Sequence, residues 1–456
     1  MRADLRLAWL LTRGSDRREG WRVLLTAVGA GLATGIAMVV AVLMPMDGHH
    51  HIGVGGGLLD EEGTRGGVVF ALTLLLIPVY GFLGQSARIG AVHRDRRLAA
   101  LRLAGAGPAQ VRRIAALESG LACLAGSAVA TTVSVPVLLR LWPHPVPLAW
   151  AGLAAVALLV PAAGAAVSAL SLRRVVTSPL GVVRRVRPVG PGRLFLVATV
   201  LLGVSALFVA AAAFVGDPFS LPLFGLAVGP LAVFALFLLV GAAAVWLAGW
   251  SSHRLGKALA ARARGATVLI AAERLRDDPW AAARTHAAVL LVTVVGTGFV
   301  GVRQVLLADL RASRREGRLG MGMSYYTNGL DLTAAAILVA LAIVLSALAV
   351  GTAESVATRR RALAAQTAAG VPQAVLARAL LLETALPLVP AVTVAGVGGM
   401  GIGVWYASLV REHTTPGMLY AALLVPVVVY ACCLLAAATS LPLLRRSAHP
   451  AELRYA

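Results

Sequence analysis

Side chains that could carry chemistry are sparse in this sequence. The only lysine, Lys257, lies in LGKALA, which lacks the G-x-x-x-x-G-K-[ST] frame of a phosphate-binding loop. The sequence also lacks the H-E-x-x-H pattern of zinc peptidases and the G-x-S-x-G pattern of serine hydrolases. We therefore predict that this chain is not an enzyme and holds no catalytic residues and no cofactor of its own.

Three consecutive histidines, His49, His50 and His51, lie near Asp47 and the acidic run 60–62. Imidazole and carboxylate groups are ligands of Zn²⁺ and Cu²⁺. However, three adjacent residues in a glycine-rich segment do not prearrange a tetrahedral site. A solvated loop is the favoured interpretation, and a metal site is the alternative.

Two further patterns favour helix packing over chemistry. GVGGMG at 396–401 satisfies the dinucleotide-binding pattern G-x-G-x-x-G. However, it lies inside an apolar run with no strand before it. Close helix contact through Gly399 and Gly403 is therefore favoured over dinucleotide binding. Glu118 and Glu383 stand at the starts of apolar runs, where the helix dipole and nearby arginines stabilise a carboxylate. Structural anchoring is favoured there, and a proton site is the alternative.

The composition is that of a membrane protein. Of 456 residues, 59% are hydrophobic and 13% are charged, with a mean hydropathy of +0.83. The net charge of +21 could indicate nucleic-acid binding in a soluble protein. Here the arginines flank apolar runs, so topology and membrane lipid explain them, and no nucleic-acid partner is expected. The first apolar run lacks a cleavage pattern and predicts an uncleaved span.

The apolar runs and their flanking charges predict a topology. Of the Lys and Arg residues, 33 fall in segments that alternate to the cytoplasmic side and 8 in segments on the other side, so both termini are predicted to be cytoplasmic. The basic segment 308–329 defies this rule and could contact anionic lipid, contact an anionic ligand, or be merely solvated. Ten transmembrane helices are predicted, at 23–44, 67–86, 115–138, 149–171, 194–215, 223–249, 286–306, 332–351, 379–406 and 419–441.

A repeat divides the chain. RRLAALRLAGAGPAQVRRIAALESG at 96–120 matches RALAAQTAAGVPQAVLARALLLETA at 361–385 with an offset of 265 residues. The segments before the first and seventh spans also correspond, with Arg13 matching Arg274. We predict an all-α polytopic fold of two parallel four-helix units joined by two extra spans. The predicted parts are 1–192, which includes an N-terminal amphipathic helix, 193–250 and 251–456.

The repeated stretch predicts an elbow at the cytoplasmic surface. Helix-favouring residues end at a glycine, and a proline follows to begin the next helix. Such an elbow could transmit a push from a cytoplasmic partner into the third or ninth span, whereas the simpler alternative is a loop that obeys the charge rule. The residues assigned to it are Arg96, Arg97, Leu101, Arg102, Gly105 and Pro108 in the first copy, and Arg361, Gly370 and Pro372 in the second.

At these residues the sequence resembles the FtsX-like permeases, the membrane subunits of MacB-type ABC transporters. The resemblance rests on an arginine-rich helix, then Leu-Arg-x-x-Gly-Ala, then an apolar helix that opens on Leu-Glu, and it extends to the Pro179 and Pro450 regions after each unit. Two units in ten spans resemble the bacitracin-export type. The large extracytoplasmic domain of many relatives has no room in the short external segments, and Gln366-Thr367 replaces Leu101-Arg102 in the second elbow.

The resemblance implies a bacterial plasma-membrane permease that moves when partner ABC ATPase subunits, in two copies, bind ATP and magnesium. The leading expectation is export or extraction of an amphipathic, lipid-like or antimicrobial substrate, as in efflux and antimicrobial resistance. The alternative is a mechanotransmitter or sensor that acts on a cell-wall hydrolase or a sensor kinase. A secondary carrier is disfavoured, because no acidic residue lies in the middle of a predicted span.

Overall fold

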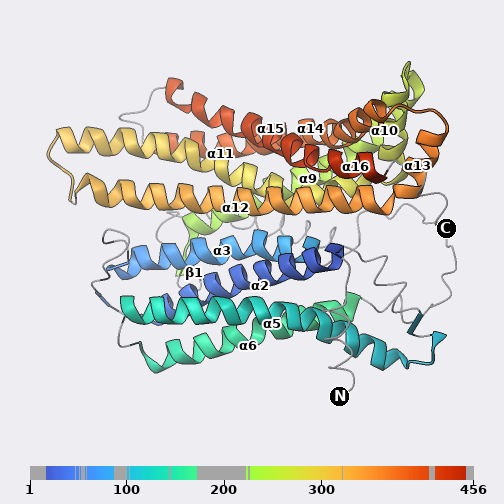
Figure 1. Ribbon diagram of the computed structural model, residues 1–456. Coiled ribbons are helices and arrows are strands. Elements are labelled where there is room, and N and C mark those ends of the chain that lie inside the picture. Colours follow the sequence, from blue (N-terminus) through green and yellow to red (C-terminus); the bar gives the residue numbers. More distant parts are fainter. Residues whose placement is uncertain are drawn as a thin grey trace. The chain divides into compact units, whose positions relative to one another are not determined.

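The computed structural model describes residues 17–46, 48–50, 52, 57, 59–86, 100–101, 103–142, 145–171, 222–223, 226–320, 322–409 and 416–447. These residues are helical except for turns and two short strands, β1 (Pro222–Leu223) and β2 (Leu226–Ala227), which pair antiparallel. The chain divides into two compact units (Figure 1). Unit 1 comprises Met1–Arg184 and Ser324–Glu354, and unit 2 comprises Arg185–Met323 and Ser355–Ala456. The three-part division drawn from the repeat stays a prediction.

Unit 1 is built around α2 (Arg17–Leu43), which packs against α3 (Glu62–Ser86), α5 (Pro108–Leu141) and α6 (Pro147–Ser171). The α2 and α5 backbones meet at glycine, because a Cβ atom placed on Gly126 would run into the backbone of Ala27. At the residue after Gly126, the Ser127 hydroxyl accepts a bond from the Thr34 hydroxyl at 3.1 Å. Residues 324–354 of α12 (Met323–Thr358) add Ile343 and Ala347 to a buried cluster with α2 and α3.

Unit 2 is built around α14 (Gln373–Leu409), which packs against α9 (Val228–Arg262), α10 (Ala266–Asp277) and α11 (Pro279–Arg315). The remaining elements are α13 (Arg360–Ala368), the 3₁₀ helix η2 (Pro416–Leu423), α15 (Leu424–Ala438) and α16 (Leu441–Ser447). The GVGGMG run lies inside α14, and its glycines face Pro426, Val240 and the backbone of Val294. This placement agrees with close helix packing.

The chain is a multi-pass helical membrane protein. Seven helices of the described part are long and apolar enough to cross a membrane. Predicted span 67–86 lies within α3. Predicted span 223–249 is helical only from Val228, in α9, because residues 222–223 and 226–227 form the two short strands; 194–215 and both termini lie outside the described residues. The total of ten spans and the cytoplasmic termini stay predictions. The seven segments are Val23–Leu43, Ala109–Leu141, Pro147–Ala166, Thr285–Arg315, Met323–Thr358, Gln373–Ala407 and Tyr420–Ser447.

The predicted external segment 307–331 is largely helical. Helix α11 continues to Arg315 and α12 begins at Met323, which leaves a short connection that contains Gly317 at φ 69°. The alanine, leucine and arginine residues in 305–315 favour helix, so the apolar run extends into a polar helical end. The basic residues Arg311, Arg314 and Arg315 are therefore displayed on a helix.

The described residues between α2 and α3 include buried ones, which differs from the predicted solvated loop. Met46 and Ile52 are buried against Leu43. The buried guanidinium of Arg65 donates to the carbonyl oxygens of Leu59 at 3.1 Å, Met46 at 2.6 Å and Gly48 at 2.9 Å. Three carbonyl oxygens thus compensate the buried charge of Arg65. The sequence analysis uses this residue only as one of the basic residues that predict the topology.

The histidine run lies within this segment. His49 is exposed and lies 3.8 Å from the Glu61 carboxylate, whereas the ring of His50 packs at 6.1 Å from Trp142. His51 lies outside the described residues. Within the described ranges, no three potential metal ligands gather at one place. The described pair is therefore split between solvent and an aromatic contact.

Candidate coupling elbows

Two glycine-centred elbows, residues 100–108 and 359–373, share one backbone geometry. Gly105 has φ 95° and Gly370 has φ 89°, the left-handed conformation that closes a helix. In each, the amide after the glycine donates to the carbonyl five residues earlier: Ala106 to Leu101 at 2.9 Å, and Val371 to Gln366 at 3.0 Å. The two bonds are related by the same offset of 265 as the sequences.

The helix that follows each elbow starts at the same register. Helix α5 begins at Pro108 and α14 at Gln373, which again differ by 265. The residue before each start accepts the first helical bond: Val111 donates to the Gly107 carbonyl at 3.1 Å, and Leu376 to the Pro372 carbonyl at 3.3 Å. The proline thus sits inside the first helix start but just before the second, because the sequences shift by one residue between glycine and proline.

The second elbow is packed into unit 2 through one face of α13. Leu363 is 2% exposed and lies in a cluster with Val356, Leu376, Leu380 and Leu444. These side chains come from the end of α12, from α14 and from α16. The opposite face leaves Arg361 exposed. The elbow therefore has a buried apolar side and an accessible basic side.

An arginine–glutamate–arginine network ties the second elbow to α10 and α14. The Glu383 carboxylate accepts bonds from Arg359 at 2.9 Å and from Arg274 at 3.3 Å. The Glu383 and Arg274 side chains are 19% and 16% exposed, and that of Arg359 is 35% exposed. Burial lowers the pKa of Arg274, and the Glu383 carboxylate opposes that shift. One carboxylate thus joins three elements separated in sequence.

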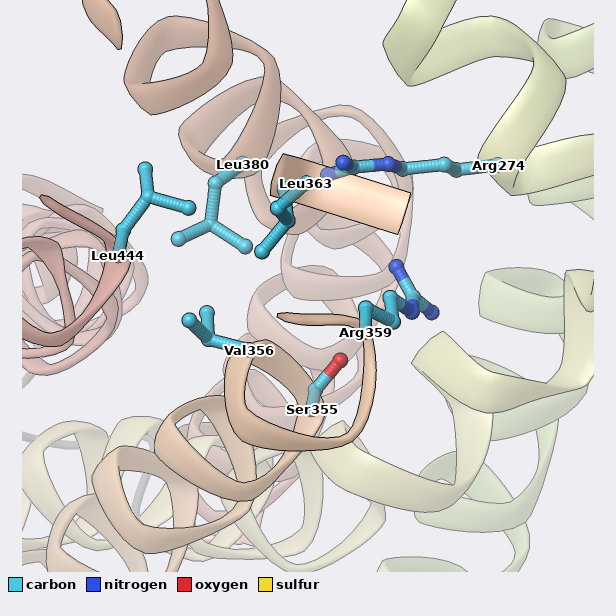
Figure 2. Close-up of a pocket in the computed structure, with 7 residues that line it drawn as sticks. All are labelled: Arg274, Ser355, Val356, Arg359, Leu363, Leu380 and Leu444. Atoms are coloured by element: carbon cyan, nitrogen blue, oxygen red, sulfur yellow. The ribbon is translucent and has the colours of Figure 1, made fainter. Parts of the chain in front are cut away.

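A small pocket adjoins this network. Figure 2 shows the side chains of Arg274 and Arg359 at one side and the four apolar residues at the other. It is enclosed by α10, α13, α14, α16 and the end of α12, all in unit 2. The lining residues are Arg274, Ser355, Val356, Arg359, Leu363, Leu380 and Leu444.

The repeat carried a signal for this network that sequence reasoning did not use. Arg359 precedes Glu383 by 24 residues, and Arg94 precedes Glu118 by the same interval. In the sequence comparison Arg274 is only the counterpart of Arg13. The sequence predicts that nearby arginines stabilise the Glu383 carboxylate, but it does not identify which arginines these are.

The described part of the first elbow differs in its acidic residue. Glu118 is 1% exposed. It lies ten residues after Pro108, and Glu383 lies ten after Gln373, so both are beyond the first turn, where the helix dipole acts. The dipole explanation therefore does not apply to either carboxylate.

Several predicted residues are outside the described part of the chain. These are Arg96, Arg97 and Arg102 of the first elbow, Arg13 of the segment before the first span, and the Pro179 and Pro450 regions. Their assigned roles stay predictions, as do the docking roles of Leu101, Arg361 and the described glycines and prolines.

Residues 68–180 match the family model for the FtsX-like permease C-terminal domain. The match spans most of α3, the first elbow, α5 and α6. No curated protein matches the chain. Part of the first unit is therefore similar to the C-terminal domain of FtsX-like permeases.

Proposed function

We propose that the chain is the permease subunit of an ABC transporter, in which a separate ATPase subunit drives export or extraction of an amphipathic, lipid-like or antimicrobial substrate. The observation that carries the proposal is the FtsX-like domain at 68–180, since permeases of this family typically form the membrane subunit of ABC-type transporters and partner with ABC ATPases. The proposal includes two FtsX-like units of the MacB type, ten spans and a bacterial plasma-membrane location.

The elbows supply a route for force in this proposal. A partner that contacts the exposed face of α13 pushes on a helix whose other face is fixed by Leu363 to α14 and α16. The Glu383 network adds a polar connection to α14 and α10. Because α14 continues for 37 residues into the apolar region, movement at the elbow displaces a membrane helix. ATP and Mg²⁺ bind to the partner ATPase, in two copies per complex.

The second candidate is a mechanotransmitter, in which the same movement acts on a sensor kinase or a cell-wall hydrolase. It is favoured by the burial of Met46 and Ile52 beside Leu43 and by the bond from Arg65 to the Met46 carbonyl, because an external segment fixed to the end of α2 can relay motion. The two candidates share the ATPase and differ in what lies beyond the membrane helices.

The test is co-purification of the full chain from its native membrane in mild detergent, with bound proteins identified by mass spectrometry. We expect an ABC ATPase with the wild type and its loss from the triple variant Arg96→Glu, Arg97→Glu, Arg102→Glu. Arg361→Glu is expected to weaken the association less, because the second elbow carries Gln366-Thr367 in place of Leu101-Arg102.

Arg262→Glu, at the exposed end of α9, is the control charge reversal for Arg361→Glu, at a residue outside both elbow sequences. Retention of the ATPase in every elbow variant would remove the docking role. Absence of any ATPase from the wild-type preparation would overturn the proposal itself. A kinase or hydrolase held together with the ATPase would favour the mechanotransmitter.

A further inference from the structure

One face of α9 carries an exposed row of aromatic and basic side chains. Trp246 and Trp250 are 43% and 44% exposed, and the Arg254 guanidinium lies 5.0 Å from the centroid of the Trp250 ring. Lys257 follows one turn later and is exposed. We call Trp246, Trp250, Arg254 and Lys257 the α9 stripe. Along α9 these four residues run from the apolar part of the helix, at the tryptophans, to its polar end, at the basic residues.

The stripe faces away from the packed side of α9. Ala244, Val245, Ala248, Ser251 and Ser252 are all buried. At 100° per residue these positions centre on the side of the helix opposite the stripe.

The contacts that hold α9 in place agree with this orientation. A Cβ atom on Gly249 would meet the Trp280 ring, and one on Gly256 would meet the Ala272 carbonyl of α10. Neither contact involves a stripe residue. The core of unit 2 therefore leaves the stripe uncovered.

The part of the chain that carries the stripe has basic residues and no acidic ones. The sequence between Asp217 and Glu273 contains no acidic residue. At 100° per residue, exposed His253 lies beside Arg254 and Lys257 on the stripe's side of α9. This segment of the chain therefore favours an anion.

The geometry points to a binding site for the headgroup of an anionic phospholipid on the α9 stripe. Arg254 and Lys257 are three residues apart, about 4.5 Å along the axis at 1.5 Å per residue, so both cations reach one phosphate. Trp246 and Trp250 sit on the apolar side of that point, where indole rings contact acyl chains near the headgroups. The cation–π contact holds the Arg254 guanidinium beside the ring.

The aromatic part of the stripe decides between a lipid and a free anion. A soluble phosphate would use the cations alone and gain nothing from two exposed indoles. A lipid uses both, since its acyl chains cover the rings while its phosphate meets Arg254 and Lys257. The inference needs only that α9 borders the membrane, so it stands apart from the ATPase and the substrate.

The test is a titration of the purified full chain, in neutral detergent, with dioleoylphosphatidylglycerol and separately with dioleoylphosphatidylcholine, with bound lipid counted by native mass spectrometry. Arg254→Gln with Lys257→Gln is expected to lower affinity for phosphatidylglycerol about thirtyfold, since the two cations add roughly equal attractions to the headgroup. Trp250→Leu keeps an apolar side chain but removes the aromatic ring face, and it is expected to lower the affinity for phosphatidylglycerol about threefold. Phosphatidylcholine binding should change little.

The matched control removes two exposed cations elsewhere in unit 2, as Arg445→Gln with Arg446→Gln on α16. An equal loss in that control would overturn the site, because lipid would then be responding to net charge alone. Unchanged binding in the α9 double variant would overturn it as well.

Because Lys257 is the only lysine, its acetylation rate gives a second readout. In vesicles with phosphatidylglycerol the wild-type rate should fall below that in pure phosphatidylcholine. Moving the lysine to α16, as Lys257→Arg with Arg446→Lys, should give a smaller difference. An equal slowing at both positions would contradict a site on α9.

Discussion

The two elbows have the same backbone, and the carboxylates that follow them differ in burial. Each has a left-handed glycine, at 105 and 370, followed by a helix at the same register. In the second elbow the carboxylate of Glu383 is shared by two arginines, whereas in the first Glu118 is almost fully buried. A repeated local sequence thus reproduced the turn, while the surrounding helices determined the environment of each carboxylate.

The units also differ in where their helices approach most closely. In unit 1 the contact of α2 and α5 lies at Gly126, eight residues after Glu118. In unit 2 the contact of α11 and α14 lies at Gly399, sixteen residues after Glu383. At 1.5 Å per residue these depths are about 12 Å and about 24 Å. The close helix contact therefore lies at a different distance from the elbow in each unit.

The largest effect is expected where helix backbones touch. Gly126→Ala and Gly399→Ala should each lower the free energy of unfolding by about 3 kcal/mol, because the new methyl meets backbone atoms that cannot move independently. The measurement is unfolding of the purified chain by titration from mild detergent into SDS, followed by fluorescence of its 8 tryptophans.

Gly401 provides the control on the same helix as Gly399. A Cβ atom there meets nothing within 4 Å, so Gly401→Ala should stabilise the chain by about 0.5 kcal/mol through helix propensity. If Gly399→Ala behaved like Gly401→Ala, the deeper crossing in unit 2 would be wrong.

A smaller loss is expected at the acidic centre of the second elbow. Glu383→Gln keeps the volume but leaves Arg274 and Arg359 facing each other without a neutralising charge. It should cost about 2 kcal/mol, less than for a fully buried pair because the side chains retain some solvent. The same SDS titration measures it.

Glu273→Gln is the matched change, since that half-exposed carboxylate pairs with Arg276 at 2.6 Å on the surface of α10. Its cost should stay within about 0.5 kcal/mol. Equal costs at Glu273 and Glu383 would show that the second elbow is not held by its network, and the contrast between elbows would disappear.

The smallest effect tests what the elbows share. Gly105→Ala and Gly370→Ala should each cost about 1 kcal/mol, because both positions are sterically open and only the positive φ opposes a side chain. Gly320→Ala, equally open and without a positive φ, should be close to neutral. The SDS titration measures both losses of unfolding free energy. Clearly unequal losses at Gly105 and Gly370 would contradict a shared backbone geometry.

Sequence reasoning was most successful where structure is local. The helices of the described spans, the break at Gly105 and Gly370 and the packing role of GVGGMG follow from apolar length, glycine conformation and small side chains. It was least successful near the histidine run 49–51, where it favoured a solvated loop, and in segment 308–329, where it left lipid contact, ligand contact and solvation open and did not predict helix. In the first, Arg65 bonds to carbonyls up to 19 residues away, and no local rule indicates those partners.

The sequence by itself determined that this is a helical membrane protein with two elbows of one design, because hydrophobic length, charge bias and glycine–proline spacing act over a few residues. Only the tertiary structure decided that Glu383 meets Arg274, 109 residues away, and that Gly126 and Gly399 meet their partner helices at different depths. It also left the α9 stripe uncovered by unit 2. These outcomes depend on which helix faces pack together, and that choice is made by the whole bundle.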